Sequence, residues 1–255
     1  MDEYAVYPSL RGRVVFVTGG ATGIGESIVA HFCRQGARVG FVDIEDTAAE
    51  NLCARLASEC GNAPLFQHCD VADIEALKSA IGQARQTLGG IRVLVNNAAN
   101  DDRHALESVS ADYWDERMAV NLRHQFFAAQ AVIPGMKEAG GGSIVNLGSL
   151  SWKVGMGGMP AYVTAKAAIS GLTRALARDV GKFNIRVNTV VPGWVMTERQ
   201  KRLWLDAEGE RTMDRMQCLA GRVMPEDIAR MVLFLAADDS RMCSAQEFIV
   251  DAGWA

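Results

Sequence analysis

The sequence predicts a single α/β domain over residues 1–255, in which about seven parallel strands form a doubly wound sheet with helices on both faces. Short apolar, β-branched runs alternate with longer stretches of helical periodicity, which is the pattern of a buried parallel sheet and its covering helices. A chain of 255 residues suits one such domain. No repeat, linker or low-complexity segment divides it.

The expected elements follow one another along the whole chain. We expect strands at residues 14–18, 38–42, 65–69, 91–95, 142–147, 185–191 and 247–250. We expect helices at about residues 23–35, 47–57, 74–88, 112–139, 160–180 and 225–236. Gly36 stands where the first helix would end in a left-handed conformation. Residues 199–220 are charged, with Trp and Met spaced along them, so the segment 194–222 is predicted to form a lid or substrate cap.

Composition excludes several classes of function. The net charge is −4 with both signs mixed along the chain, which argues against binding to nucleic acid or to a membrane surface. The six cysteines lack Cys-x-x-Cys and zinc-like spacing, and we interpret them as reduced thiols in a cytoplasmic protein. His104 and His124 have no companion carboxylate at ligand spacing, so no metal site is expected. The acidic start at residues 1–3 and the absence of long apolar runs predict neither a secretory signal nor a membrane span.

A glycine-rich turn stands between the first expected strand and the first expected helix. Residues 18–25 have the sequence Thr-Gly-Gly-Ala-Thr-Gly-Ile-Gly. Such glycines let the backbone approach a pyrophosphate, which the N-terminus of the following helix attracts. Because the next strand finishes at Asp43, the unit matches the dinucleotide-binding half of a Rossmann-type fold.

Asp43 also bears on the choice of cofactor. A carboxylate at this position can accept both ribose hydroxyls of NAD and repels the 2′-phosphate of NADP. The next residue is Ile44 rather than arginine, and the glycine turn carries no basic residue, so NAD is the predicted cofactor. The alternative is that Asp43 is the N-cap of the following helix.

Tyr162 and Lys166 lie four residues apart in an expected helix, so their side chains share one face. An ammonium about 4 Å from a phenol, at an effective dielectric of about 20, favours phenolate by roughly 4 kcal/mol, or about 3 pK units. That shift brings a tyrosine into the range of a general base. Ser149 lies just past an expected strand, where its hydroxyl could bind the same reacting oxygen. The alternative is a surface helix in which the pair occurs by chance.

The order of motifs over essentially the whole chain resembles the short-chain dehydrogenase/reductase family. The matching motifs are Thr18-Gly-x-x-x-Gly-x-Gly25, Asp70-Val71, Asn96-Asn-Ala98, Asn121, Ser149, Tyr162-x-x-x-Lys166 and Pro192-Gly193. The resemblance implies that Tyr162 exchanges the proton and Ser149 binds the substrate oxygen. It implies that Lys166 holds the ribose and tunes Tyr162, and that Asn121 supports a relay water. It implies cofactor contacts from Gly19, Thr22, Gly23, Ile24, Gly25, Asp43, Asp70, Val71, Asn97, Ala98, Tyr162, Lys166, Pro192, Gly193, Val195 and Thr197.

Other segments narrow the resemblance. Ala99 departs from the family, which usually carries glycine there. The chain is similar to aldose 1-dehydrogenases, the bacterial NAD-dependent D-xylose enzymes among them, at residues 100–104, 113–117, 121–124, 217–219 and 251–254. That similarity implies oxidation of a cyclic aldose, a pentose or a hexose, at C1 to its lactone. The loop 154–159 and the corner 192–194 differ from those enzymes, so the sugar stays open.

The residues themselves are compatible with a sugar substrate. Residues 100–104 (Asn-Asp-Asp-Arg-His) follow a strand at the edge of the sheet where ligands bind, and a polyol needs many donors and acceptors. Tryptophan faces suit the apolar side of a pyranose. Substrate contacts are therefore predicted from Asn100, Asp102, Arg103, His104, Ser149, Trp152 and Trp194. The alternatives are that Asp102 and Arg103 pair within the loop, and that either tryptophan belongs to the core.

Two other functions stay open, and an assembly is expected. The same four catalytic positions would serve a polyol dehydrogenase or a carbonyl reductase, and a non-catalytic NAD-sensing regulator could use the same scaffold. Family resemblance also implies a homotetramer with paired helices and paired terminal strands. Small residues in the helix 160–180 would allow close approach, namely Ala161, Ala165, Ala168 and Gly171. The alternative is that they seat this helix on its own sheet.

Overall fold

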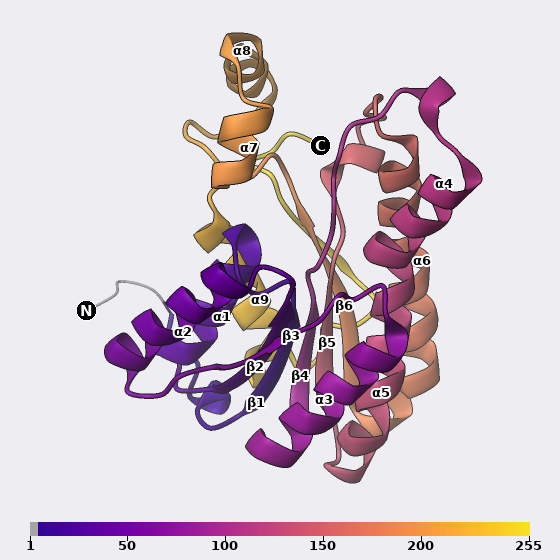
Figure 1. The fold of residues 1–255 in the computed structure, drawn as a ribbon. Helices are drawn as coiled ribbons and strands as arrows, with labels where there is room; N and C mark the ends of the chain where they lie inside the picture. The colour runs from indigo at the N-terminus through magenta and orange to yellow at the C-terminus, as the bar shows by residue number, and fades with distance from the viewer. Residues whose placement is uncertain (1–4) are drawn as a thin grey trace.

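The computed structural model describes residues 5–255, so the acidic start at residues 1–3 lies outside the described residues. Within them, seven strands pair in parallel in the order β3-β2-β1-β4-β5-β6-β7, which confirms the predicted doubly wound α/β domain (Figure 1). The strands are β1 (Val14–Thr18), β2 (Arg38–Asp43), β3 (Leu65–His68), β4 (Ile91–Asn96), β5 (Gly142–Leu147), β6 (Ile185–Pro192) and β7 (Glu247–Val250). Every boundary lies within one residue of its predicted place.

Helices cover both faces of the sheet. They are α1 (Gly23–Arg34), α2 (Asp46–Cys60), α3 (Ile74–Leu88), α4 (Ala111–Met118), α5 (His124–Glu138), α6 (Pro160–Val180), α7 (Glu198–Leu203), α8 (Ala207–Met216) and α9 (Pro225–Ala236). Side chains of α1, α2 and α9 pack on one face, and those of α3, α5 and α6 pack on the other. Gly36 follows α1 in the predicted left-handed conformation, with φ of 75°. Among the described helices, none has the length and apolar character needed to cross a membrane.

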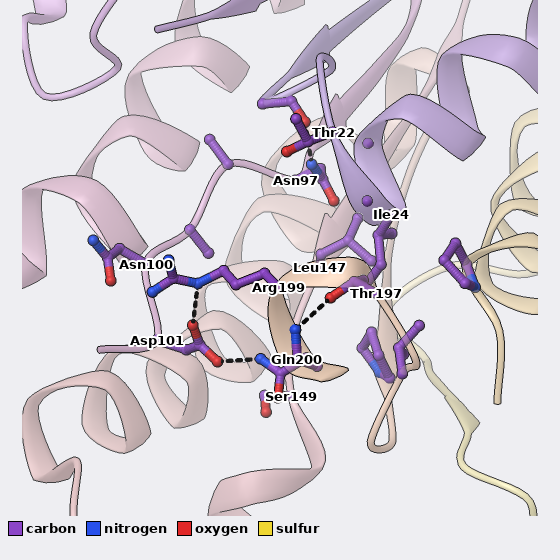
Figure 2. Close-up of a pocket in the computed structure, with 18 of the residues that line it drawn as sticks. Thr22, Ile24, Asn97, Asn100, Asp101, Leu147, Ser149, Thr197, Arg199 and Gln200 are labelled. Carbon is purple, nitrogen blue, oxygen red and sulfur yellow. Dashed lines mark hydrogen bonds and ion pairs between the residues drawn. The ribbon is translucent and has the colours of Figure 1, made fainter. Parts of the chain in front are cut away.

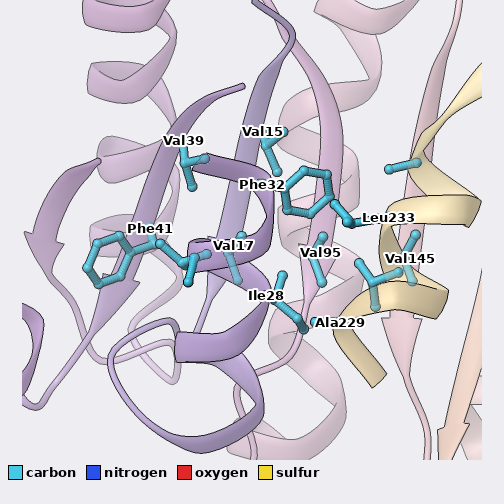
Figure 3. Packing of buried hydrophobic residues seen from close by; sticks show 14 of the residues in the cluster. Val15, Val17, Ile28, Phe32, Val39, Phe41, Val95, Val145, Ala229 and Leu233 are labelled. Atoms are coloured by element: carbon cyan, nitrogen blue, oxygen red, sulfur yellow. The ribbon is translucent and has the colours of Figure 1, made fainter. Parts of the chain in front are cut away.

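Strand periodicity divides the core into two layers. Side chains point alternately to the two faces of a strand, so Val15 and Val17 join one cluster while Phe16 joins the other. Figure 3 shows the first cluster, in which Phe32 of α1 and Leu233 of α9 lie over the central strands. Because this sheet is buried on both faces, its strands are near-continuous apolar runs, which is why they were visible in the sequence.

The long helix expected at residues 112–139 is wrong as a single element. A π-helical turn (Ala119–Arg123) interrupts it and separates α4 from α5. Asn121 sits inside this turn, wholly buried, and its Nδ2 donates to the carbonyl oxygen of Arg117 at 3.0 Å. A π-turn adds one residue to the helical turn. The hydrogen bond to Arg117 holds the Asn121 side chain in a fixed position inside it.

The segment 194–222 stands beyond the carboxyl ends of the strands, where α7 and α8 lie next to the C-terminus (Figure 1). Each of its two helices starts with a side-chain cap. Thr197 accepts from the N–H of Gln200, and Asp206 accepts from the N–H of Gly209. A bridge between Val195 and Val223 joins the two ends of the segment. The segment is therefore a helical insertion whose two ends lie side by side.

Candidate active site

A large cavity opens at the carboxyl ends of the strands, where β1 lies between β2 and β4. The strand order reverses direction at this point, and ligands of doubly wound sheets bind there. The volume of about 1080 Å³ lies at the upper end of ordinary ligand sites, enough for a dinucleotide and a small substrate. The glycine turn forms one end of its lining, and the segment that follows β6 covers the other.

The glycine turn is packed so closely that side chains are excluded from it. A Cβ on Gly25 would lie 1.7 Å from the carbonyl oxygen of Gly19, and a Cβ on Gly19 would lie 2.7 Å from Cα of Ala98. Asn97 Nδ2 donates to the carbonyl oxygens of Gly19 at 2.6 Å and of Thr18 at 3.2 Å. Thr18 Oγ1 accepts from the N–H groups of Asn97 and Ala98. The turn is thus fixed from both sides, and its backbone forms the floor of the cavity.

The start of α1 offers free donors to a ligand. Thr22, the N-cap, makes no side-chain hydrogen bond to the described helix, so the first N–H groups of α1 are available. A helix N-terminus attracts anions. Gly23 follows with φ of 57°, and a Cβ there would lie 3.2 Å from Cγ2 of Thr197. This narrow, donor-rich floor fits the pyrophosphate of a dinucleotide.

Asp43 is tied to the glycine turn. Its Oδ2 accepts from the N–H of Ala21 at 2.8 Å, and its Oδ1 accepts from the N–H groups of Ile44 and Glu45 at 2.8 and 3.1 Å. The N-cap of α2 is Glu45, so the alternative assignment of Asp43 as the cap is wrong. These bonds use three of the roughly four acceptor positions of the carboxylate, so Oδ2 keeps capacity for a ligand. The carboxylate lines the cavity in a fixed orientation and can accept a hydroxyl there.

The whole set of residues predicted to contact a dinucleotide comes together. Asp70 and Val71 follow β3 at the far end of the cavity from Tyr162 and Lys166, and Asp70 Oδ1 accepts from the N–H of Ala72 at 2.8 Å. All of the predicted residues line the cavity, namely Gly19, Thr22, Gly23, Ile24, Gly25, Asp43, Asp70, Val71, Asn97, Ala98, Tyr162, Lys166, Pro192, Gly193, Val195 and Thr197. The donor-rich floor and the acid at the end of β2 fit a dinucleotide.

The four residues predicted to be catalytic lie at two depths. Ser149 follows β5, while Tyr162 and Lys166 lie one turn apart near the start of α6, and all three line the cavity. Asn121 lies behind this wall, wholly buried. Its Oδ1 accepts from the N–H of Asn100 at 2.8 Å, so it holds the loop that follows β4.

The phenol of Tyr162 is not activated in the way that the spacing predicts. Lys166 Nζ donates to the carbonyl oxygen of Leu147 at 2.8 Å and lies 5.6 Å from the centroid of the Tyr162 ring. Burial raises the pKa of Tyr162 to about 12, against the lowering effect of the Ser149 hydroxyl. Burial also lowers the pKa of Lys166 to about 8. The pKa of the phenol is therefore raised rather than lowered as the spacing predicts, because desolvation disfavours the phenolate.

A layer of buried polar side chains lies behind the cavity wall. Asn96 Nδ2 donates to Asn146 Oδ1, and Asn146 Nδ2 donates to Thr173 Oγ1, each at 2.9 Å. His124 is wholly buried, and neither ring nitrogen has a hydrogen-bond partner among the described residues. Burial, and then the charge of Lys166, lower the pKa of His124 to about 3, so the ring is neutral. Within residues 5–255, no group of three or more His, Cys, Asp and Glu could hold a metal ion.

The residues predicted to contact substrate separate into two groups. Four of them line the cavity, namely Asn100, Arg103, Ser149 and Trp194. The described lining does not include the other three, which are Asp102, His104 and Trp152.

Partners elsewhere hold the three residues that the cavity lining lacks. Asp102 forms an ion pair with Arg199, and its Oδ2 lies 3.7 Å from Arg117 Nη1, so the predicted pairing of Asp102 within its own loop is wrong. The ring of His104 hydrogen-bonds to the hydroxyl of Tyr113 at 2.9 Å. The ammonium of Lys153 lies 4.3 Å from the ring centroid of Trp152.

Sequence patterns did not predict the partners of the loop after β4 in the cavity. Asp101 meets Arg199 and Gln200 of α7 in the cavity (Figure 2). Arg103 Nη1 donates to the sulfur atoms of Met156 and Met159 at 3.4 and 3.3 Å. These partners are 53 to 99 residues apart in the chain, so no local pattern predicts them. The only available signal was the mixed charge of residues 199–220.

Known proteins share this architecture. A family model described as enoyl-(acyl carrier protein) reductase matches residues 19–255, which include the glycine turn, Ser149, Tyr162 and Lys166. The chain belongs to the short-chain dehydrogenase/reductase family. It is therefore an oxidoreductase of a family that works with a nicotinamide cofactor, and the dinucleotide cradle described above is where that cofactor fits.

Individual members of the short-chain dehydrogenase/reductase family are similar over nearly the whole chain. D-xylose 1-dehydrogenase from Caulobacter vibrioides is 50% identical over 250 residues, covering 98% of each chain. A probable galactose dehydrogenase from Rhizobium meliloti is 50% identical over 247 residues, covering 97% of this chain and 96% of the relative. A solved double variant of a Serratia marcescens short-chain dehydrogenase/reductase superposes with a TM-score of 0.89 at 32% identity, over 96% of this chain and 99% of that one.

Proposed function

We propose that this enzyme oxidises a cyclic aldose, a pentose or a hexose, at C1 to the lactone, with NAD as the cofactor. The observation that carries the proposal is that Ser149, Tyr162 and Lys166 line the same cavity as a dinucleotide cradle. The names of the two relatives at 50% identity, which are an aldose 1-dehydrogenase and a probable galactose dehydrogenase, support a sugar as the substrate.

Each catalytic side chain has a place in this reaction. The hydroxyl at C1 would lie against Ser149 and Tyr162, where the serine hydrogen-bonds to it and the phenolate oxygen takes its proton. Lys166 would stabilise the phenolate, because an ammonium on the same helix face favours the charged form once the site is filled. Bound NAD supplies the acceptor for the hydride that leaves C1. Asn121, which also holds the loop that follows β4, would support a relay water for the proton's exit.

The anomeric carbon is the favoured site of oxidation. The ring oxygen stabilises the positive charge that develops on C1 as hydride leaves, and no other carbon of a cyclic aldose has that help. Loss of hydride and of the hydroxyl proton converts the hemiacetal to a lactone, so electrons and protons balance without a further reactant. Polar groups of the loop after β4, Asn100 and Arg103 among them, line the space that the remaining hydroxyls would enter.

Asp43 supports NAD over NADP. Its carboxylate lines the cavity at the end of β2, where it is held by three backbone N–H groups. A fixed negative charge there would repel a 2′-phosphate, and the neighbouring Ile44 offers no cation to bind one.

We also propose that the segment 194–222 acts as a lid and that the enzyme assembles as a homotetramer. Trp194, Arg199 and Gln200 line the cavity, as a lid would require. In α6, Ala161 and Ala165 are buried within the described chain and seat the helix on its own domain, as the alternative held. Gly171 is exposed, and Ile249 on the edge strand β7 is 40% exposed, so a partner could cover both. Light scattering at micromolar concentration tests the assembly, and a monomeric mass contradicts it.

A panel of substrates tests the reaction. We expect the purified enzyme to reduce NAD with at least one of D-xylose, L-arabinose, D-galactose and L-fucose. Open-chain polyols such as xylitol and threitol, and ketones offered with NADH, are the comparison set. If only polyols or ketones react, the enzyme is a polyol dehydrogenase or a carbonyl reductase. If nothing reacts while NAD binds, the NAD-sensing regulator replaces both.

A further inference from the structure

Two polar side chains from distant parts of the chain meet inside the cavity. Asp101 lies in the loop that follows β4, and Gln200 lies in α7 of the segment 194–222. Gln200 Nε2 donates to Asp101 Oδ2 at 2.6 Å, as Figure 2 shows. Both residues line the cavity that also holds Ser149 and Tyr162. The contact therefore links the loop that follows β4 directly to the proposed lid, the segment 194–222.

The orientation of the Gln200 amide is fixed by a tryptophan. Trp194 Nε1 donates to Gln200 Oε1 at 3.0 Å. An indole N–H can only donate, so the amide oxygen must face Trp194 and the amide nitrogen must face Asp101. The Trp194 ring also packs on α8, since a Cβ added to Gly209 would lie 2.7 Å from the ring. Gln200 thus presents a second N–H in a direction that its neighbours hold constant.

The charge of Asp101 is balanced within the same cluster. Arg199 Nε donates to Asp101 Oδ1 at 3.3 Å, and the same guanidinium pairs with Asp102. Asp102 in turn lies 3.7 Å from Arg117 Nη1. Arg117 also pairs with Glu116, so three carboxylates face these two guanidinium groups, and this side of the cavity suits a neutral polar ligand better than an anion.

Asp101 is also close to the reacting groups. Its side chain is 20% exposed. Burial raises the pKa of Tyr162 and the charge of Asp101 adds to this, while the same charge offsets part of the lowering of the pKa of Lys166 by burial. A ligand bound at Ser149 and Tyr162 therefore shares its cavity with Asp101 and Gln200. A carboxylate accepts and an amide N–H donates, whereas a hydroxyl does both, so the pair matches a second hydroxyl of a vicinal diol.

We infer that Asp101 and Gln200 together form a subsite for one ring hydroxyl close to the reacting one. This hydroxyl would donate to Asp101 and accept from Gln200, and so hold the segment 194–222 closed. The inference rests on the proposed sugar substrate and deepens it. A simple alcohol has no group to join the pair, so it would leave the carboxylate and the amide imperfectly paired in a closed site. Loss of this hydroxyl would then lower kcat as well as weaken binding, since closure of the segment completes the site.

The test compares Gln200→Leu and Asp101→Asn with the unaltered enzyme. Each is assayed on the best aldose from the panel, on its 2-, 3- and 4-deoxy analogues, and on 2-propanol or cyclohexanol as alcohols without a neighbouring hydroxyl. The matched control is Arg211→Gln, which removes an exposed ion pair with Glu208 on α8 of the same segment. NAD affinity, measured by fluorescence, shows that each variant keeps its fold.

We expect the unaltered enzyme to prefer the aldose over one deoxy analogue by about tenfold or more in kcat/KM. In both variants of the pair this preference should shrink to about twofold, while Arg211→Gln should keep it. Gln200→Leu should affect the simple alcohols little, whereas Asp101→Asn also removes a charge that acts on Tyr162 and is judged by the preference alone. The position of the sensitive deoxy analogue identifies the hydroxyl. Equal losses on the aldose, on every deoxy analogue and on the simple alcohols would overturn the inference, because the pair would then only support the fold of the segment.

The two proposals fail in different ways. If the enzyme oxidises polyols but no aldose, the proposed function is wrong, and the same variants are then compared on a polyol and its deoxy analogues. Loss of discrimination on that series keeps the hydroxyl subsite. Retained discrimination in both variants, on either series, rejects the subsite whatever the substrate proves to be.

Discussion

The two ends of the cavity are built on different principles. At the cofactor end, closely packed backbone groups and glycines form the surface. A Cβ on Gly25, for example, would lie 1.7 Å from a carbonyl oxygen. At the substrate end, side chains from the β4 loop and α7 meet each other, as Asp101 and Gln200 do at 2.6 Å. The cofactor end is thus fixed by the fold, while the substrate end is assembled from long polar side chains.

This difference shows where one scaffold can vary. A cradle of backbone and glycine tolerates almost no substitution, so it suits a ligand that does not change. Pairs of exposed or half-buried side chains contribute little to stability, and exchange of one pair alters the ligand without altering the fold. Tyr162 and Ser149 lie where the two ends meet, and they require both ends to be in place.

The largest effect is expected at this junction. Tyr162→Phe removes the only group assigned to take the proton, so turnover should fall by about 10³-fold or more, while NAD affinity stays within about twofold. Stopped-flow assays and fluorescence titration of NAD measure the two quantities. Substantial turnover by this variant at any pH from 6 to 10 would mean that another group takes the proton.

Substitution of two glycines tests whether the cofactor end is a rigid cradle. Gly25→Ala forces a methyl into the backbone of the turn, and we expect a cost of about 1–3 kcal/mol, seen as a roughly 5- to 150-fold loss of NAD affinity. The matched control is Gly157→Ala in the loop after β5, where a Cβ has nothing within 4 Å. Gly157→Ala should leave NAD affinity unchanged. Equal effects of the two substitutions would refute the rigid cradle.

Lys166 provides a test of burial at the junction. The pKa of its buried ammonium is lowered from 10.5 to about 8, so between pH 8 and 10 the unfolded chain holds a proton that the folded chain has lost. Stability then rises with pH in this window. Tyr162, whose raised pKa acts in the opposite sense, opposes this only above about pH 10.

The measurement is urea unfolding of the unaltered enzyme and of Lys166→Met at pH 8, 9 and 10. The free energy of unfolding of the unaltered enzyme should gain about 2 kcal/mol on that of the variant across the window. Parallel pH profiles would show that Lys166 keeps its ordinary pKa in the folded protein.

Asp43→Ala should give the smallest effect, confined to the cofactor end. We expect the unaltered enzyme to prefer NAD over NADP by about tenfold or more, or about 1.4 kcal/mol, and the variant to lose most of that preference. Initial rates with both cofactors at saturating sugar measure it. Comparable efficiency of the unaltered enzyme with both cofactors would contradict the role given to Asp43, and a changed KM for sugar in the variant would show that the two ends are coupled.

The same contrast explains which features the sequence predicted. Strand boundaries and the glycine turn were predictable because they depend on local patterns, such as buried β-branched runs and the spacing of Gly19, Gly23 and Gly25. The other cavity residues predicted to contact the cofactor came from the family resemblance. The π-turn around Asn121 was not, because its helical periodicity continues on both sides of one extra residue. Spacing placed Tyr162 and Lys166 on one face but could not show that Lys166 Nζ turns to the Leu147 carbonyl.

At the substrate end, the prediction for Asp102 failed for a physical reason. Asp102 was expected to touch substrate or to pair with Arg103, its neighbour in sequence, yet its partners are Arg199 and Arg117. The choice among several nearby guanidinium groups depends on how α7 folds back over the loop. That arrangement has no local signature, so Gln200 and Arg199 could be found only from the structure.

Transfer of isotope from C1 tests the proposed reaction most directly. The enzyme is supplied with NAD and an aldose of the panel deuterated at C1, and the reduced cofactor and the sugar product are followed by mass spectrometry and NMR. We predict one deuterium in each reduced cofactor and a lactone that appears before the free acid. Reduced cofactor without deuterium, or a product that keeps its C1 deuterium, would contradict oxidation at the anomeric carbon.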